Sequence, residues 1–350
     1  MNINGKQISV NNKPYLIAEM SGNHKKDFSR AIEIIDKAKA NGADAVKFQT
    51  YKPETITMNM KSEAFKVKDK LWSGRYLWDV YDEGSMPWEM QEELFKYCKE
   101  ISFTAFSSPF DLTAIEFLER IDVPAYKIAS FEILDLELIS ECCKTGKPVI
   151  ISTGMASYDE IDDAINVATK YTDKSNLCLL HCISGYPSKP EDYNLKKIPE
   201  LSNRYGVKVG LSDHTEDNLV PLLSVPLGAC VIEKHITLSK NDGALDSKFS
   251  MDPNQLKELS AQLNIASKTL KGEKRISEGE MNNRLFRRSL YFAKDLKKGE
   301  VIDRDAIKSI RPGDGLKPKY LSDVIGKQVS QDVFYGTPIL KEKIIGFQEE

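Results

Sequence analysis

Residues 29–50 read SRAIEIIDKAKANGADAVKFQT and contain one complete helix–turn–strand unit. Apolar residues recur near helical spacing over residues 30–41, which predicts an amphipathic helix with Ser29 as its N-cap. Gly42 stands where a glycine in the left-handed conformation commonly ends a helix. The apolar run Ala45–Gln49 then predicts a strand.

The same alternation of apolar runs and amphipathic stretches predicts eight strand–helix units. Such units pair their strands in parallel through right-handed crossovers, and eight of them favour an α/β fold, a (β/α)8 TIM barrel, over an open sheet. No G-x-G-x-x-G follows a strand, which argues against a dinucleotide-binding fold. The predicted strands are 15–18, 45–49, 103–106, 125–128, 148–151, 177–180, 207–211 and 230–232, and the predicted helices are 30–41, 88–100, 111–120, 136–144, 157–170, 195–205, 219–226 and 253–270.

A change of pattern divides the chain after the last predicted helix. We assign residues 1–270 to the barrel and residues 271–284, which are charged and contain two glycines, to a linker. In residues 285–350, short apolar pieces alternate with turn-forming Gly and Pro, which predicts a small, mostly β module.

Composition excludes several classes of protein. The chain has 350 residues, with 49 Lys and Arg against 52 Asp and Glu, so electrostatics give no support for nucleic-acid binding. No apolar run approaches the ~18 residues of a membrane span, and the first residues lack a signal-peptide pattern. Six cysteines are too sparse for a disulfide framework. We therefore expect buried, reduced thiols in a cytoplasmic protein with neither nucleic-acid nor membrane partners.

Polar residues gather at the carboxyl ends of the predicted strands, where a (β/α)8 barrel places its chemistry. All four histidines of the chain lie at such ends. Loops after strands are polar in any protein, so Ser and Asp alone would prove little. The candidate residues are Glu19, His24, Lys47, Gln49, Ser108, Lys127, Ser130, Ser152, His181, Ser184, Tyr186, Ser212, Asp213, His214, Glu233, Lys234 and His235.

His214 and His235 are the candidate metal ligands, because they follow adjacent predicted strands. Two imidazoles with water and substrate oxygen suit Mn²⁺ or Mg²⁺ better than a closed zinc site. The alternative is that both histidines only anchor loops. Similarly, His24 and His181 either line the site or are structural, and we favour the structural interpretation.

Lys47 and Lys127, with the hydroxyls of Ser130, Ser152 and Ser212, are suited to hold a phosphate and a carboxylate. The alternative is that each lysine pairs with an acidic residue at a strand end. The chain has no Walker-type loop, so we do not expect a nucleotide phosphate.

Glu19 follows the first strand and could act as a general base or orient a water molecule; the alternative is a solvated carboxylate. Three tryptophans, Trp72, Trp78 and Trp88, lie in or beside the long loop after the second strand. They either pack in the protein or line an apolar part of a substrate.

Taken in order, the strand ends resemble the sialic acid synthase family, which condenses phosphoenolpyruvate with an amino sugar. The tail resembles the antifreeze-like (SAF) domain of the same family through Arg287–Tyr291 and Arg311–Leu316. The residues 107–110, 129–132 and 246–250 resemble the pseudaminic acid synthase branch, and Ser184 stands where the N-acetylneuraminate branch usually has Asn. The motifs that carry the family resemblance are IAEM (17–20) with Asn23-His24, GADAVKFQT (42–50), YKIAS (126–130), STGM (152–155), GLSDHT (210–215) and IEKH (232–235).

The resemblance implies a role for each matching residue. It makes His214 and His235 ligands of a divalent metal, Mn²⁺ or Mg²⁺, and Glu19 a catalytic residue. It further implies sugar contacts by Gln49, Ser184, Tyr186, Asp246 and Arg311, and phosphoenolpyruvate contacts by Lys47, Ser108, Lys127, Ser130, Ser152 and Ser212.

The implied reaction joins phosphoenolpyruvate to 2,4-diacetamido-2,4,6-trideoxy-L-altrose and water, giving pseudaminic acid and phosphate. The resemblance also implies a domain-swapped homodimer in which Arg311 completes the active site of the partner chain. The alternatives are N-acetylneuraminate or legionaminate synthesis, a metal-dependent aldolase, and a sugar-binding protein without activity.

Overall fold

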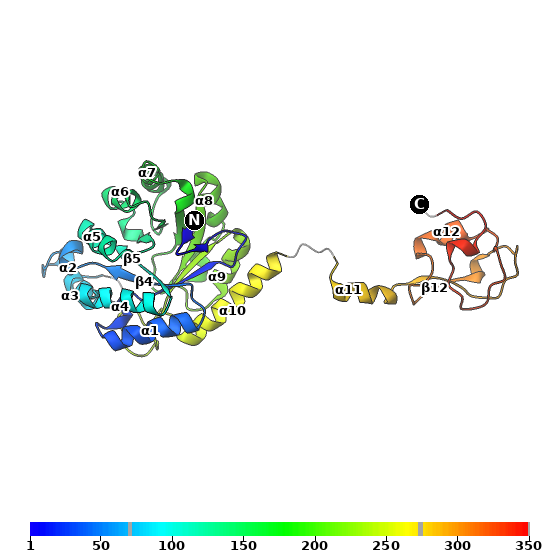
Figure 1. The fold of residues 1–350 in the computed structure, drawn as a ribbon, viewed down its shortest axis with the longest axis horizontal. Coiled ribbons are helices and arrows are strands. Elements are labelled where there is room, and N and C mark those ends of the chain that lie inside the picture. Colours follow the sequence, from blue (N-terminus) through cyan, green and yellow to red (C-terminus); the bar gives the residue numbers. More distant parts are fainter. Residues whose placement is uncertain (69–71, 272–275, 349–350) are drawn as a thin grey trace. The chain divides into compact units, whose positions relative to one another are not determined.

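The computed structural model describes residues 1–68, 72–271 and 276–348. The chain separates into two compact units, Met1–Lys271 and Gly272–Glu350 (Figure 1). Within the described ranges, no helix has the length and apolar character needed to cross a bilayer. All six cysteines are buried and free.

The first unit is a closed parallel barrel, which confirms the predicted (β/α)8 fold (Figure 1). Neighbouring strands follow the order of the chain, and β10 closes the circle by pairing with β3. The barrel strands are β3 (Tyr15–Glu19), β4 (Ala45–Thr50), β5 (Thr104–Pro109), β6 (Tyr126–Ile128), β7 (Val149–Ser152), β8 (Leu177–Cys182), β9 (Lys208–Asp213) and β10 (Val231–His235).

Side chains along each strand alternate between the barrel lumen and the surrounding helices. On β3, Ile17 packs in an apolar core inside the lumen, whereas Leu16 and Ala18 pack in the larger core beneath the helices. The lumen series continues to Glu19 on β3 and to Lys47 on β4, and both side chains are buried. The lumen is therefore apolar toward the amino ends of the strands and charged at their carboxyl ends.

Helices cover the outside of the barrel, and their buried faces follow the predicted apolar periodicity. Asp27, not Ser29, caps the first of them by accepting a hydrogen bond from the Arg30 amide at 3.0 Å. Aspartate and serine are comparable N-caps, so the local pattern did not decide between them. The covering helices are α1 (Phe28–Ala40), α4 (Trp88–Glu100), α5 (Leu112–Arg120), α6 (Leu136–Lys144), α7 (Tyr158–Ala168), α8 (Lys197–Tyr205), α9 (Leu219–Ser224) and α10 (Pro253–Leu270).

Two features of the barrel unit were not predicted. A hairpin of β1 (Asn2–Ile3) and β2 (Lys6–Gln7) precedes the barrel, and Ile3 and Ile8 join the apolar core of the lumen. The long loop after β4 contains the short helices α2 (Pro53–Ile56) and α3 (Leu77–Gly84).

The second unit has its own apolar core and antiparallel pairing, as predicted for a small, mostly β module. Its strands are β11 (Ser289–Phe292) and β12 (Ile307–Ile310), and single bridges such as Leu296–Val333 extend the pairing. The predicted linker includes residues 272–275, which lie outside the described residues. Its later part contains helix α11 (Glu278–Asn282).

Candidate active site

Four charged side chains from four strands meet at the carboxyl end of the lumen, all of them at most 5% exposed. Lys47 Nζ lies 2.5 Å from Glu19 Oε2 and 3.8 Å from Glu233 Oε2. Lys127 Nζ lies 3.8 Å from the other carboxylate oxygen of Glu233. The ion pairs expected from the alternative interpretation are therefore present, and they form one network rather than two separate pairs.

Burial and mutual attraction shift the pKa values of this network. Burial raises the pKa of Glu19 to about 7, with Lys47 opposing the shift. Burial alone would lower the pKa of Lys47, but Glu19 and Glu233 outweigh it and raise that pKa. Burial lowers the pKa of Lys127. Burial alone would raise the pKa of Glu233, but the two lysines hold it below its usual value. Within this network, Glu19 is thus the carboxyl group whose pKa lies near neutral pH.

Three of the candidate serines lie close to the two lysines or to the glutamate between them. Ser108 Oγ accepts from Lys47 at 3.1 Å and Ser152 Oγ accepts from Lys127 at 2.6 Å. Ser212 donates to Glu233 at 3.2 Å. Directed hydroxyls beside two ammonium groups suit the binding of an anion with several oxygen atoms.

Gly154 allows two further hydroxyls to approach the same place. Ser130 Oγ accepts from the Gly154 amide at 3.2 Å. A Cβ atom at Gly154 would lie 2.4 Å from Ser184 Oγ and 2.7 Å from Ser130 Oγ, so a side chain there would displace both. The buried Ser184 Oγ has no hydrogen-bond partner within the described part of the chain, which leaves it available to a ligand.

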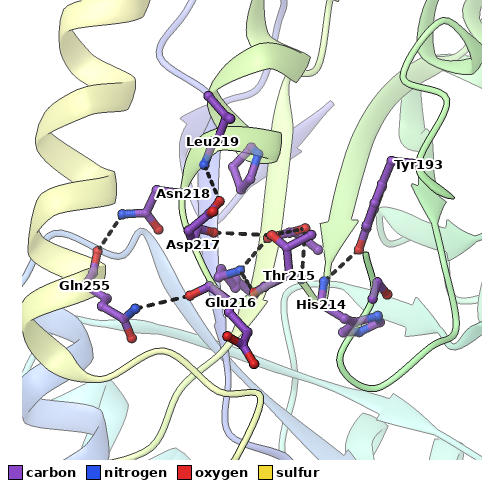
Figure 2. Close-up of polar contacts among 12 residues, drawn as sticks. Tyr193, His214, Thr215, Glu216, Asp217, Asn218, Leu219 and Gln255 are labelled. Atoms are coloured by element: carbon purple, nitrogen blue, oxygen red, sulfur yellow. Dashed lines mark hydrogen bonds and ion pairs between the residues drawn. The ribbon is translucent and has the colours of Figure 1, made fainter. Parts of the chain in front are cut away.

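The rings of His214 and His235 lie side by side, with centroids 5.3 Å apart. His214 Nδ1 lies 2.8 Å from the Ile183 carbonyl, and its amide donates to Tyr193 Oη at 2.7 Å (Figure 2). His235 Nδ1 is buried and has no partner among the residues described. These two imidazoles therefore could hold a divalent ion whose remaining ligands are water and substrate oxygen. No cluster of three or more His, Cys, Asp or Glu able to hold a metal occurs in the described ranges.

Aromatic rings line the space around the histidine pair. The Tyr186 ring lies 4.4 Å from that of His214, and Phe249 lies 5.0 Å from His235. Trp72 extends this wall, since its ring is 6.4 Å from Tyr186. Trp88 instead stacks on Phe117 at 4.9 Å, which is packing.

Gln49 and Asp246 add an amide and a carboxylate group at the same carboxyl end of the barrel. Gln49 Nε2 donates to Glu19 at 2.9 Å and to Ser21 at 3.0 Å. Asp246 Oδ2 accepts from the Gly22 amide at 3.3 Å, and burial raises the pKa of Asp246.

Known proteins carry the same architecture along nearly the whole chain. A model described as the NeuB family matches residues 34–275, and one described as the SAF domain matches residues 287–345. The chain belongs to the NeuB family. The resemblance identified from the strand ends and the tail is thereby confirmed.

Relatives in this family include a pseudaminic acid synthase of Helicobacter pylori, 40% identical over 95% of this chain and 98% of that protein. An N,N'-diacetyllegionaminic acid synthase of Legionella pneumophila is 36% identical over 94% of each chain. The crystal structure of an N-acetylneuraminic acid synthetase from Leptospira borgpetersenii is 30% identical, with a TM-score of 0.70 over 81% of this chain and 94% of that one.

Two candidate histidines of this NeuB-family chain make their contacts outside the cluster. His24 Nδ1 accepts from the Lys26 amide at 2.9 Å, and His181 Nε2 contacts the Tyr193 carbonyl, which fits structural roles for both. Arg311 belongs to the SAF domain, in the exposed loop after β12.

Two carboxyl groups were given no role by the sequence analysis. Glu233 bridges Lys47 and Lys127, and the period-2 alternation of its strand was a signal that it faces the lumen. Burial raises the pKa of Glu132 to about 7, and its Oε2 has no partner in the described ranges. Glu132 lies in the short turn after β6, where no periodicity indicates a direction.

Proposed function

We propose that this chain is a pseudaminic acid synthase that joins phosphoenolpyruvate, 2,4-diacetamido-2,4,6-trideoxy-L-altrose and water, and releases pseudaminic acid and phosphate. The buried Lys47–Lys127 site with its serine hydroxyls supports an enzyme that binds a small anion with a phosphate and a carboxylate. The 40% identity to a pseudaminic acid synthase over 95% of the chain supports the choice of sugar.

In this proposal, C3 of phosphoenolpyruvate forms a bond to the aldehyde carbon of the open-chain sugar, whose oxygen takes a proton. Positive charge develops at C2, and water adds there and loses a proton. The hydroxyl group at C2 then becomes the keto oxygen as the C2–O bond to phosphate breaks, and inorganic phosphate leaves with the proton of that hydroxyl. Lys47, Lys127 and the serines hold the anion in register, so their contribution is proximity and electrostatic stabilisation.

Glu19 is proposed to orient or deprotonate the water that adds at C2. Its carboxylate contacts Lys47 on one side and Gln49 on the other, which fixes its direction. His214 and His235 would hold Mn²⁺ or Mg²⁺, which when bound supplies Lewis-acid polarisation of the sugar aldehyde.

A panel of aldoses tests the function directly. Phosphate release from phosphoenolpyruvate should be fastest with the 2,4-diacetamido-2,4,6-trideoxy sugar, because Trp72 and Tyr186 offer an apolar wall to a 6-methyl group. A kinetic preference for N-acetylmannosamine or for the legionaminate precursor would contradict the choice of sugar. Turnover without phosphoenolpyruvate would instead indicate an aldolase, and sugar binding without turnover a non-catalytic protein.

The pH dependence of turnover tests Glu19. Because burial raises its pKa to about 7, the carboxylate form is lost as the pH falls through that value, and kcat/KM should fall with it. An unperturbed glutamate would titrate near pH ~4.3. Phosphate release would be measured from pH ~5.5 to ~8.5, a range that spans this pKa.

Glu19→Gln is the control, because the substrate phosphate itself titrates near pH ~6 in both proteins. Turnover by the variant should be slower, and its pH profile should show only the titration of the substrate phosphate. Identical profiles for the two proteins would show that Glu19 is not the titrating base.

We further propose a homodimer in which Arg311 completes the partner's active site, acting in the cytoplasm, where reduced thiols are the norm. The loop around Arg311 is well fixed, since Ser289 Oγ donates to the Pro312 carbonyl at 2.7 Å and accepts from the Gly315 amide at 2.9 Å. A Cβ atom at Gly315 would lie 2.3 Å from the Leu290 carbonyl, so this position requires glycine. The backbone therefore presents an exposed arginine on a fixed loop.

Mixing Arg311→Ala and His214→Ala proteins under subunit exchange tests this arrangement. If Arg311 acts in trans, each mixed dimer regains one intact site, made of the Arg311→Ala barrel and the other chain's arginine. Phosphate release should then return in the mixture although both parents are inactive. Exchange without recovery would show that the SAF domain serves its own barrel.

A further inference from the structure

A second buried ion pair lies directly beside the histidine pair. Lys234 on β10 contacts the carboxylate of Asp213 on β9, and the two side chains are 1% and 0% exposed. Glu233 and Ser212, one residue earlier, face the lumen, where they contact each other at 3.2 Å. Since side chains alternate along a strand, Asp213 and Lys234 point out of the lumen.

Thr215 completes this ion pair into a closed cluster. Its hydroxyl donates to both carboxylate oxygens of Asp213, at 3.0 and 2.8 Å, and its amide donates to Oδ1 at 3.2 Å. Lys234 also donates to the Thr215 carbonyl. The cluster therefore binds the end of β10 to the chain on both sides of His214.

Stability is a weak reason for such a pair. Taking two charges out of water is costly, and apolar residues of similar volume often give a protein that is as stable or more stable. The position of the pair offers a better reason. The ladder between β9 and β10 pairs Lys234 with Asp213 at its carboxyl end, and His235 and His214 are the next residues.

The segment that carries His214 is also held by residues outside β9 and β10, with Tyr193 on one side of it and Gln255 on the other (Figure 2). Tyr193 Oη accepts from the His214 amide at 2.7 Å. Gln255 at the start of α10 donates to the Glu216 carbonyl at 3.2 Å, and its own carbonyl accepts from Asn218 at 3.3 Å. The Asp213–Lys234 pair is the cross-strand side-chain link nearest to both histidines, since Ser212 and Glu233 meet one residue earlier on each strand.

We propose that the Asp213–Lys234 ion pair, completed by Thr215, is a positioning device that fixes the separation of the two imidazoles so that both bind one divalent ion. This inference rests on the metal role proposed above for His214 and His235. Asp213, Thr215 and Lys234 are positioning residues, because their side chains face away from the lumen.

The double variant Asp213→Asn/Lys234→Met tests the proposal. It removes both charges with little change of shape, so the protein should still fold, as judged by circular dichroism and Tm. The Kd for Mn²⁺, measured by calorimetry without substrates, should rise at least about tenfold. The kcat should fall, while KM for phosphoenolpyruvate should change less than about threefold, because Lys47 and Lys127 lie on other strands. A folded variant that binds Mn²⁺ as tightly as the unmodified protein would overturn the proposal.

A measurement without metal separates this proposal from the metal role itself. The chain has four histidines, so protein with only its histidine rings protonated gives a small set of signals. The nuclear Overhauser effect between the rings of His214 and His235 should be clear in the unmodified protein and weak in the double variant. An unchanged effect would overturn the proposal even if no metal binds. Equal Mn²⁺ affinity of the unmodified protein and His214→Ala/His235→Ala would instead reject only the metal role.

Two further comparisons test whether the effects arise from partial unfolding or from the loss of any nearby charge. Thr215→Val removes the hydroxyl that bridges the pair and should raise the Mn²⁺ Kd about threefold, whereas Thr215→Ser, which keeps it, should raise it less. Equal affinities of the two variants would count against the proposal. Asp242→Asn breaks the partly buried Arg30–Asp242 pair at the same mouth and should leave the inter-ring effect unchanged. Loss of that effect in Asp242→Asn would mean that the ring separation is not set by Asp213 and Lys234.

Discussion

The double variant His214→Ala/His235→Ala should lose turnover by at least about 1,000-fold, equivalent to about 4 kcal/mol of transition-state stabilisation. The reason is that the two rings, 5.3 Å apart, are the adjacent imidazoles of the site, and the ion they are proposed to hold would stabilise charge on the sugar oxygen. Chelation of the unmodified enzyme should abolish phosphate release, and Mn²⁺ or Mg²⁺ should restore it.

His24→Ala is the matched control, since this histidine lies at the same end of the barrel but contacts the Lys26 amide. The control should keep its dependence on added metal. Full activity of the double variant, or of the unmodified enzyme in the presence of chelator, would show that turnover does not depend on a metal bound by these histidines.

Lys47→Met and Lys127→Met should each lower kcat/KM for phosphoenolpyruvate at least about tenfold, equivalent to about 1.4 kcal/mol. Each change removes one of the two buried ammonium groups that face the serine hydroxyls. Lys47→Met should also move the acid limb of the pH profile upward, because Glu19 loses the cation that lowers its pKa. Initial rates at varied phosphoenolpyruvate and pH measure both effects.

Stability must be followed in these variants, because breaking one partner from a buried pair costs about 3–5 kcal/mol. Lys47→Met/Glu19→Gln leaves no unpaired charge at that position, so comparing its Tm with that of Lys47→Met shows how much of the loss in Lys47→Met is loss of folding. Lys6→Met is the surface control, since Lys6 pairs with Asp44 and its side chain is 53% exposed. Unchanged kinetics in Lys47→Met and Lys127→Met would show that both lysines have a purely structural role.

The candidate site could be predicted in part, because polar residues at strand ends are visible in the sequence. Lys47 and Lys127 were found in this way, and both lie in the lumen. Glu233 had the same signal, but its bridging role depends on which strands are neighbours. Trp72 and Trp88 were equivalent in the sequence, and only the path of the chain placed Trp72 near Tyr186 and Trp88 on Phe117.

The sequence by itself determined the order of strands and helices, the barrel and the residues at the strand ends, because periodicity, caps and turn residues are local properties. Only the tertiary structure decided which of those residues meet. Closure of the barrel pairs β10 with β3, and this brings Glu233 to the Lys47–Glu19 pair although more than 180 residues separate them in the chain. Likewise, the register that sets Lys234 opposite Asp213 places the two histidines together. Strand register and closure depend on packing between distant segments, which no local pattern contains.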